Sequence, residues 1–331
     1  MNAFARLPLS EQALYFRQAA QKMNLSAEAV EKDFWVVWVL GRLFSSASLG
    51  PKILFKGGTS LSKVFELIDR FSEDIDLILD WNELAGEPPM AERSRTKQDR
   101  FNKSVSQISR RYIAENFLPE VVHQLDGLCT ASVEELAADV IAIQYPSSFA
   151  SEYLRPEIRL EIGPLAQWIP NARFRVRSYV SDVFPELFKV PDCEVQVIKP
   201  ERTFWEKATI LHHEAHRPDS SPVPARYSRH YYDLYLMSRD AEVKEAALGD
   251  MALLASVVAF KQKFYPRGWA KYEQAKPGSL RLMPPERILK AMRQDYRAMG
   301  EMIFGRHPSW EEIMEGLTAL ENEINFAGEG E

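Results

Sequence analysis

The sequence predicts an α+β fold, with a small mixed sheet early in the chain and helices in the later part. Short apolar runs bounded by turn residues lie between about residues 52 and 198, which is typical of strands. From about residue 199 onward the apolar residues recur at the spacing of buried helix faces. We therefore expect a first domain over residues 1–198, with a helical lead-in, and a helical second domain over residues 199–331.

Composition is that of an ordinary globular protein. The chain has 331 residues, of which 46% are hydrophobic and 27% charged, enough for one large core or two moderate ones. The two cysteines, Cys129 and Cys193, cannot form a disulfide framework, so we expect inert thiols in a reducing compartment. The best apolar run, Phe34–Leu40, is far shorter than the roughly 20 residues of a spanning helix. We expect a cytoplasmic protein with no membrane partner.

The first elements are expected in a simple order. Helical apolar spacing predicts a lead-in over about Glu11–Leu49. A short strand over Lys52–Phe55 then leads into a helix that begins at a glycine pair and ends near Asp69. A second strand follows over about Ile75–Leu79.

The later elements follow a proline-containing loop over Glu87–Ser94, after which a basic helix continues to about Arg111. Pro200 is expected to open a helix that ends near His216, because proline is favoured at the first helical position. From Ser228 onward the pattern is helical with short breaks. Further strands are expected over Asp139–Tyr145, Pro156–Ile162, Phe174–Val180 and Glu194–Ile198.

The stretch KGGTSLSK, from Lys56, has the pattern of a phosphate-binding turn. A strand that delivers Gly57 and Gly58 into a helix lets backbone N–H groups point outward, where the helix dipole favours an anion. Thr59 and Ser60 are suitable caps, and their hydroxyls can also donate to phosphate oxygens. The order of a Walker A loop is missing, and ordinary turn chemistry also explains the glycines when they are considered alone.

The stretch SEDIDLIL supplies carboxylates close behind that turn. Strand alternation places Ser72, Asp74 and Asp76 on one face, with the two carboxylates about 7 Å apart. Like charges at this distance repel each other unless a cation neutralises them, and Mg²⁺ (or Mn²⁺) takes such ligands together with substrate phosphates. Solvated acids on a surface strand are the alternative. Together with the glycine turn, the pattern predicts a site for a nucleoside triphosphate and its metal ions.

These motifs resemble the DNA polymerase beta-like nucleotidyltransferase superfamily. KGGTSLSK followed by RFSEDIDL is similar to the AbiEii/AbiGii branch, which includes the MenT toxins of toxin–antitoxin pairs. The segments EKDFWVVWVL, ERTFWEKATILHH, SRHYYDLYLM and PGSLRLMPPERILKAMRQDYRAM also resemble that branch, so the likeness covers nearly the whole chain. It implies a polymerase beta-like core plus a helical C-terminal region, and a growth-inhibiting toxin with a cognate antitoxin.

The expected site includes further residues. Nucleotidyl transfer usually needs a third carboxylate, for which we choose Glu161, with Glu157 as the alternative on the same alternating strand. The resemblance implies that Lys207 supplies a cation to the triphosphate. Asp233 lies in the apolar stretch YYDLYLM and needs a neutralising partner, Lys207 or Arg229; we expect it in the catalytic set, with a purely structural buried ion pair as the alternative. The expected metal ligands are therefore Asp74, Asp76 and Glu161, and the expected nucleotide-binding residues are Gly57, Gly58, Thr59, Ser60, Lys63, Ser72 and Lys207.

The expected activity is transfer of NMP from an NTP to an acceptor. The resemblance implies an RNA acceptor, tRNA 3′ ends in particular. A protein acceptor, an NTP-binding module without chemistry and a pure scaffold remain alternatives. Because the net charge is −6, RNA contact needs a local basic face, and the best one is the basic run, with a solvated helix face as the alternative. That run contains Arg93, Arg95, Lys97, Arg100, Lys103, Arg110 and Arg111, against Asp99 alone.

The run HHEAH suggests zinc through the i, i+4 pair His212 and His216. Because the order is not His-Glu-x-x-His and no cysteine lies nearby, we instead expect histidines at a helix C-terminus, where partial positive charge is favourable.

Overall fold

The computed structural model describes residues 1–72, 74–80, 84–149, 155–164 and 166–326. The chain forms two compact units. The first contains Met1–Val64 and Glu73–Ile198, and the second contains Phe65–Ser72 and Lys199–Glu331. The division predicted from the sequence had assigned residues 65–72 to the first domain. The structure groups this segment with the later part of the chain.

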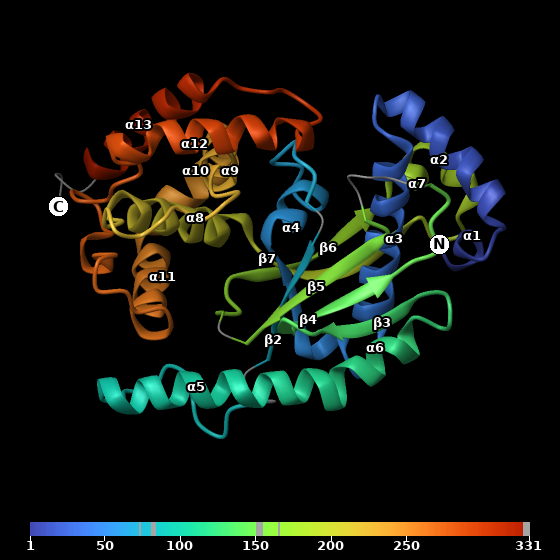
Figure 1. Cartoon of the computed structure of the whole chain (residues 1–331), viewed down its shortest axis with the longest axis horizontal. Helices are drawn as coiled ribbons and strands as arrows, with labels where there is room; N and C mark the ends of the chain where they lie inside the picture. Colours follow the sequence, from blue (N-terminus) through green and yellow to red (C-terminus); the bar gives the residue numbers. More distant parts are fainter. Residues whose placement is uncertain (73, 81–83, 150–154, 165, 327–331) are drawn as a thin grey trace. The chain divides into compact units, whose positions relative to one another are not determined.

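The first unit is built on a mixed sheet (Figure 1), which confirms the α+β class. Within the described residues the sheet has seven strands in the order β3-β4-β5-β2-β1-β7-β6. Strand β2 pairs parallel with β5 and antiparallel with β1, and β1 pairs parallel with β7. The strands are β1 (Ile53–Lys56), β2 (Asp74–Leu79), β3 (Thr130–Glu134), β4 (Ala137–Gln144), β5 (Glu157–Gly163), β6 (Asn171–Arg177) and β7 (Asp192–Ile198).

The helical lead-in expected over Glu11–Leu49 consists of two helices, α2 and α3. Asn24 adopts a left-handed conformation and ends the first, and the Ser26 side chain accepts a hydrogen bond from the backbone of Ala29 and begins the next. The helices of the first unit are α1 (Asn2–Ala5), α2 (Leu9–Met23), α3 (Ala27–Ser45), α4 (Gly57–Lys63), α5 (Arg95–Tyr112), α6 (Leu118–Gln124) and α7 (Tyr179–Val183), with a π-helical turn over Ile113–Phe117 between α5 and α6.

Two expected boundaries were wrong, and one strand was missed. Helix α4 ends at Lys63 rather than near Asp69, because Glu66 has a left-handed φ of 52° that no α-helix can continue. Strand β6 stops at Arg177, since Ser178 forms a capping box that starts α7. Strand β3 was not predicted at all, because an exposed edge strand shows little apolar alternation.

Helix α3 covers one face of the sheet (Figure 1) and contacts β7 and β5. Gly41 of α3 lies directly against Cys193 of β7, and a Cβ at residue 41 would stand 3.1 Å from the Cys193 Cβ. Strand alternation and pairing put Cys193, Phe55 and Leu77 on this same face. The unit's main core therefore lies between α3 and the face opposite to Asp74 and Asp76.

The face that carries Asp74 and Asp76 has a smaller apolar cluster farther along. Leu54 and Ile78 are register partners and pack with Ala166 and Ile198, and Trp168 covers them in part. Strand alternation thus gives the sheet one apolar face and one mixed face. On the mixed face the apolar cluster lies at one end, and Asp74 and Asp76 lie at the other.

The second unit is helical, apart from residues 65–72 and irregular segments around residues 216–227, 265–285 and 303–309. The expectation of short breaks after Ser228 was therefore too simple. No helix within the described residues combines the length and apolar character needed to cross a membrane. The α-helices are α8 (Pro200–Ala215), α9 (Ser228–Arg239), α10 (Ala241–Leu248), α11 (Met251–Phe264), α12 (Glu286–Met299) and α13 (Trp310–Phe326).

A buried ion pair fastens three helices of the first unit. Asp33 of α3 lies 2.6 Å from the Lys63 ammonium at the end of α4, and its second oxygen accepts a 2.6 Å hydrogen bond from the backbone N–H of Tyr179 in α7. The Lys63 ammonium also lies 3.7 Å from the centre of the Tyr179 ring. Burial raises the pKa of Asp33, and the Lys63 charge opposes that rise.

We predict that Asp33→Ala lowers the free energy of unfolding by about 3–5 kcal/mol, because it leaves the Lys63 charge and the Tyr179 N–H without their anion. Urea unfolding measures the loss. Asp126→Ala is the matched control, since Asp126 pairs with Arg6 at the exposed surface and should cost less than about 1 kcal/mol. Equal losses in the two variants would contradict a structural role for the Asp33 pair.

Candidate functional site

The register of β2 and β5 brings two of the predicted carboxylates together. Asp76 is the direct partner of Glu161, so their side chains leave the same face of the sheet on neighbouring strands. Glu157 lies four residues earlier on β5 and accepts a 2.8 Å hydrogen bond from Gln144. Of the two candidates for the third carboxylate, Glu161 is therefore the one beside Asp76.

Asp74 is paired in register with Arg159 rather than with an acid. Arg159 Nη1 lies 3.2 Å from Glu161 Oε1 and 3.6 Å from Asp74 Oδ1. Its other nitrogens contact Glu134, Nε at 2.7 Å and Nη2 at 3.3 Å. The hydrogen bond to Glu134 raises the pKa of Arg159 against the opposing effect of burial, and the neighbouring carboxylates add to the rise. The sequence analysis did not identify this arginine.

The carboxylate oxygens of Asp74, Asp76 and Glu161 are the donor type that hard divalent cations take. Across the part of the chain that the structure describes, no three His, Cys, Asp or Glu side chains are gathered closely enough to hold a metal ion. Arg159 contacts Asp74 and Glu161, two of the three expected ligands. The donors fit a divalent cation in type, and the register places Asp76 beside Glu161.

Gly57 is required by its position against Asp76. Its φ is +84°, a conformation that disfavours any side chain, and a Cβ there would overlap the Asp76 carboxylate. The sequence interpretation gave the glycine one purpose, to free backbone N–H groups for a phosphate. The structure adds a second, because only glycine lets the Asp76 carboxylate lie against the start of α4.

The neighbouring hydroxyls are directed into the protein. Thr59 donates to the Asp74 backbone carbonyl, and Ser60 donates to the Gly57 carbonyl at 2.8 Å. Both side chains are buried, and neither caps α4, whose N-cap residue is Lys56. The expected capping is therefore wrong, and the structure does not favour hydroxyl donation to phosphate. The Thr59 bond instead ties α4 to the first residue of β2.

The other predicted nucleotide-binding residues of this region lie in three different surroundings. Gly58 is the second residue of α4 and half-buried. Lys63 is held by Asp33 and Tyr179, which gives its ammonium a structural partner and does not favour a role as a phosphate ligand. Ser72 ends the segment 65–72, which belongs to the second unit.

Lys207 and Asp233 meet inside the second unit. The Lys207 ammonium lies 2.6 Å from Asp233 Oδ2, and Asp233 is fully buried. The second cation is Arg70 rather than Arg229, and it binds both oxygens of Asp233 at 2.7 and 2.8 Å. Burial alone would raise the pKa of Asp233, but the charges of Arg70 and Lys207 outweigh it and lower that pKa.

Arg70 is therefore a residue that the sequence analysis missed. Its segment pairs with the chain around residue 303, where Phe71 N–H donates to Met302 at 2.7 Å and Phe304 N–H donates to Asp69 at 2.8 Å. The sequence carried no clear signal for it, because Arg70 directly follows Asp69 and its burial shows only in the structure.

The histidines at the end of α8 are structural. His212 Nδ1 accepts a 3.0 Å hydrogen bond from the backbone of Arg281, and Nε2 lies 3.0 Å from the Lys271 carbonyl. Burial lowers the pKa of His212 to about 4 and that of His213 to about 3, so both are neutral at pH 7. The expected benefit of positive charge at this helix end is wrong for these two buried rings.

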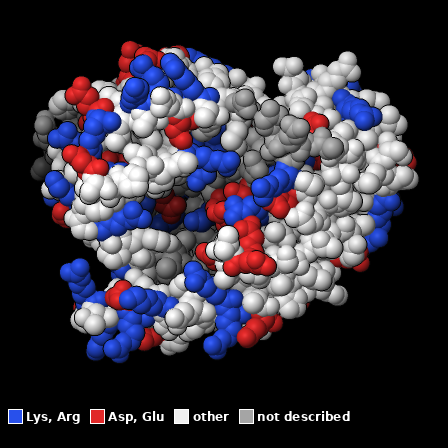
Figure 2. All heavy atoms as spheres, in the orientation of Figure 1, with Lys and Arg blue, Asp and Glu red and all other residues white. Residues whose placement is uncertain are grey.

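The basic run forms helix α5, and Lys and Arg side chains gather over that helix in Figure 2. Arg93 does not belong to this surface. It bonds the carbonyls of Pro88 and Pro89, and its guanidinium lies 3.8 Å from the centre of the Phe101 ring. Lys97, Arg100, Lys103, Arg110 and Arg111 are exposed and lie on the side of α5 opposite to its buried residues.

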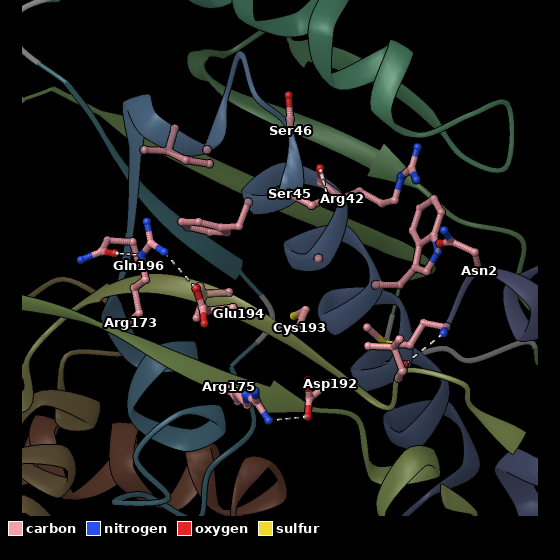
Figure 3. Close-up of a pocket in the computed structure, with 18 of the residues that line it drawn as sticks. Asn2, Arg42, Ser45, Ser46, Arg173, Arg175, Asp192, Cys193, Glu194 and Gln196 are labelled. Carbon is pink, nitrogen blue, oxygen red and sulfur yellow. Dashed lines mark hydrogen bonds and ion pairs between the residues drawn. The ribbon is translucent and has the colours of Figure 1, made fainter. Parts of the chain in front are cut away.

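A cavity of about 1150 Å³ lies elsewhere in the first unit (Figure 3). Residues of α3, β6, β7 and the N-terminal segment line it, and none of the predicted site residues does. Its charged side chains pair with one another, Arg173 with Glu194 at 3.3 Å and Arg175 with Asp192 at 3.9 Å. Burial raises the pKa of the Cys193 thiol there to about 12, so it is not a nucleophile.

Comparisons with known proteins agree with the motifs. A family described as the AbiEii nucleotidyl transferase toxin of type IV toxin–antitoxin systems matches residues 38–316. Similar solved structures include the nucleotidyltransferase toxin MenT4 from Mycobacterium tuberculosis H37Rv, with 15% identity, a TM-score of 0.40, and coverage of 95% of this chain and 99% of that one. A second, from H. pylori and named as a candidate nucleotidyltransferase, has 13% identity, a TM-score of 0.41 and coverage of 92% and 99%.

No curated protein matches the sequence. The family match spans most of the chain and contains all the predicted catalytic residues, from Asp74 to Asp233. The chain belongs to the AbiEii family of nucleotidyltransferase toxins.

Proposed function

We propose that this nucleotidyltransferase moves NMP from an NTP to an acceptor hydroxyl with the help of a divalent cation, Mg²⁺ or Mn²⁺. The observation that carries the proposal is the position of Asp76. It stands beside Glu161 on the neighbouring strand and against Gly57, the positive-φ residue that begins α4. One short stretch of sheet thus joins hard oxygen donors to a turn of bare backbone.

The chain's own residues have separate tasks in this proposal. Asp74, Asp76 and Glu161 hold the cation, which when bound supplies positive charge to the phosphates. Gly57 and Gly58 leave room for phosphate oxygens at the start of α4. Glu161 is also the candidate base for the acceptor's proton, because it stands beside Asp76 and is half-exposed.

Lys207 is proposed to neutralise charge on the triphosphate. It shares its carboxylate partner with Arg70, and Arg70 takes both Asp233 oxygens, so the ammonium keeps positive charge to offer an anion. Burial lowers the pKa of Lys207, and Asp233 opposes this. Asp233 then acts by holding the ammonium in place rather than by touching the nucleotide.

The acceptor is proposed to be RNA, with tRNA 3′ ends as the first candidate, and the setting a cytoplasmic toxin neutralised by an antitoxin protein. Family membership supports the toxin and its antitoxin. The basic surface of α5 supports RNA, because such contacts hold a phosphate backbone without reading its sequence. Transfer to a protein is the second candidate.

We predict that Asp76→Asn lowers NMP transfer by about 100-fold or more, because it keeps the side chain's shape and removes the charge that holds the cation. Labelled NTP with total RNA measures transfer, and urea unfolding should show little change. Glu161→Gln should also lose activity, whereas Glu157→Gln, a matched change on the same strand, should stay near the parental rate. Parental activity in Asp76→Asn would exclude the proposed cation site.

We predict that substitution of Lys207 weakens NTP binding, whereas substitution of Asp233 lowers stability. Lys207→Met leaves Asp233 paired with Arg70, so the protein should fold normally but bind NTP at least about tenfold more weakly. Asp233→Ala leaves two buried cations without their anion and should cost about 3–5 kcal/mol of stability. Thermal unfolding and NTP titration distinguish these outcomes. Unchanged NTP affinity in Lys207→Met would make Lys207 a structural residue only.

For the acceptor, we predict that reversing Arg100, Lys103 and Arg110 to Glu weakens RNA labelling about tenfold or more while NTP affinity stays near normal. The matched control reverses three exposed cations of α12, Lys290, Arg293 and Arg297. Both variants change the net charge equally. If the two variants lose RNA labelling equally, the loss reflects total charge, and the basic surface of α5 is not the RNA-binding surface. Label on protein alone would favour the second candidate acceptor.

A further inference from the structure

We propose that Arg159 is a resident counter-ion of the carboxylate set, which an incoming divalent cation must displace, so that Arg159 sets the affinity of the site for metal. The inference rests on the proposed function, because the cation is the one proposed there. It concerns a residue of this chain that neither the motifs nor the family match single out.

The contacts of the guanidinium divide into two groups. Its Nε and Nη2 edge bonds both oxygens of Glu134, at 2.7 and 3.3 Å. Only Nη1 reaches the carboxylate set, at 3.2 Å from Glu161 and 3.6 Å from Asp74. The planar arginine fork is therefore anchored along one edge, while a single tip lies between the two acids.

Glu134 is suited to be the anchor. It ends strand β3, and the pairing with β4 shifts between Val133 and Glu134, an irregularity of the kind that redirects a side chain. The Arg159 hydrogen bond lowers the pKa of Glu134, so the anchor is a full negative charge at neutral pH. Glu134 can keep the guanidinium while its tip releases Asp74 and Glu161.

The charges decide the direction of the effect. A positive group within 4 Å of two carboxylates stabilises them and repels a second cation that seeks the same oxygens. Arg159 is about one-third exposed, so solvent reduces this repulsion without abolishing it. Removal of the guanidinium should strengthen metal binding, whereas a residue that merely braces the strands would leave binding unchanged or weaken it.

The experiment is a Mn²⁺ titration of the full chain without nucleotide, followed by the electron paramagnetic resonance of free Mn²⁺. Arg159→Gln should bind Mn²⁺ about tenfold more tightly than the parent, which corresponds to about 1.4 kcal/mol. Arg159→Lys keeps the charge and should stay within about threefold of the parent. Arg159→Met, which keeps the aliphatic stem, replaces the Gln variant should that variant fail to fold.

The matched control is Arg155→Gln, which removes an exposed arginine that lies 3.7 Å from Glu157, just before β5. It should leave Mn²⁺ affinity unchanged. Equal or weaker binding by Arg159→Gln, with Asp76→Asn still abolishing it, would overturn the counter-ion and leave the cation site standing. Parental Mn²⁺ binding by Asp76→Asn would instead overturn the proposed cation site, and the counter-ion with it.

Discussion

The parallel pairing of β2 with β5 is the constraint on which the first unit depends. It joins two strands separated by more than 70 residues of chain, and it fixes which side chains of the two strands are neighbours. A slip of β5 by one residue would turn Glu161 away from the face of Asp76 and bring Leu160 out of the core onto that face. The apolar face under α3 therefore fixes the register, and the register in turn fixes the carboxylate pair.

The alternation of β2 and the glycine pair were sufficient to predict the position of Asp74 and Asp76 on one face. The choice of Glu161 over Glu157 rested on its place within the strand, because alternation puts both on one face and only the register with β2 distinguishes them. Arg70 and Arg159 were missed for one physical reason. An arginine's role depends on the anion it meets, and both meet carboxylates far away in the sequence, Asp233 and Glu134.

Boundaries failed where local signals compete with tertiary demands. The apolar spacing after Lys63 is helical, yet residues 65–72 leave the helix and join the second unit, where Arg70 binds Asp233. The two ion pairs of this region use burial differently. Asp33 and Lys63 match one charge with one charge, whereas Asp233 pairs with two cations, Arg70 and Lys207.

The return of segment 65–72 to later residues has a consequence for the order of folding during synthesis. Its partners, Asp233 and residues 302–304, are synthesised some 160 to 230 residues after it. Synthesis proceeds at about 5–20 residues per second. The segment therefore waits roughly ten seconds or more for its partners. By contrast, β2, the strand that follows it in the chain, belongs to a unit whose last residue is Ile198. Nascent chains long enough to pair β2 with β5 still lack Asp233, the anion for Arg70, so the ion pairs of Asp233 with Arg70 and Lys207 form after that strand pairing.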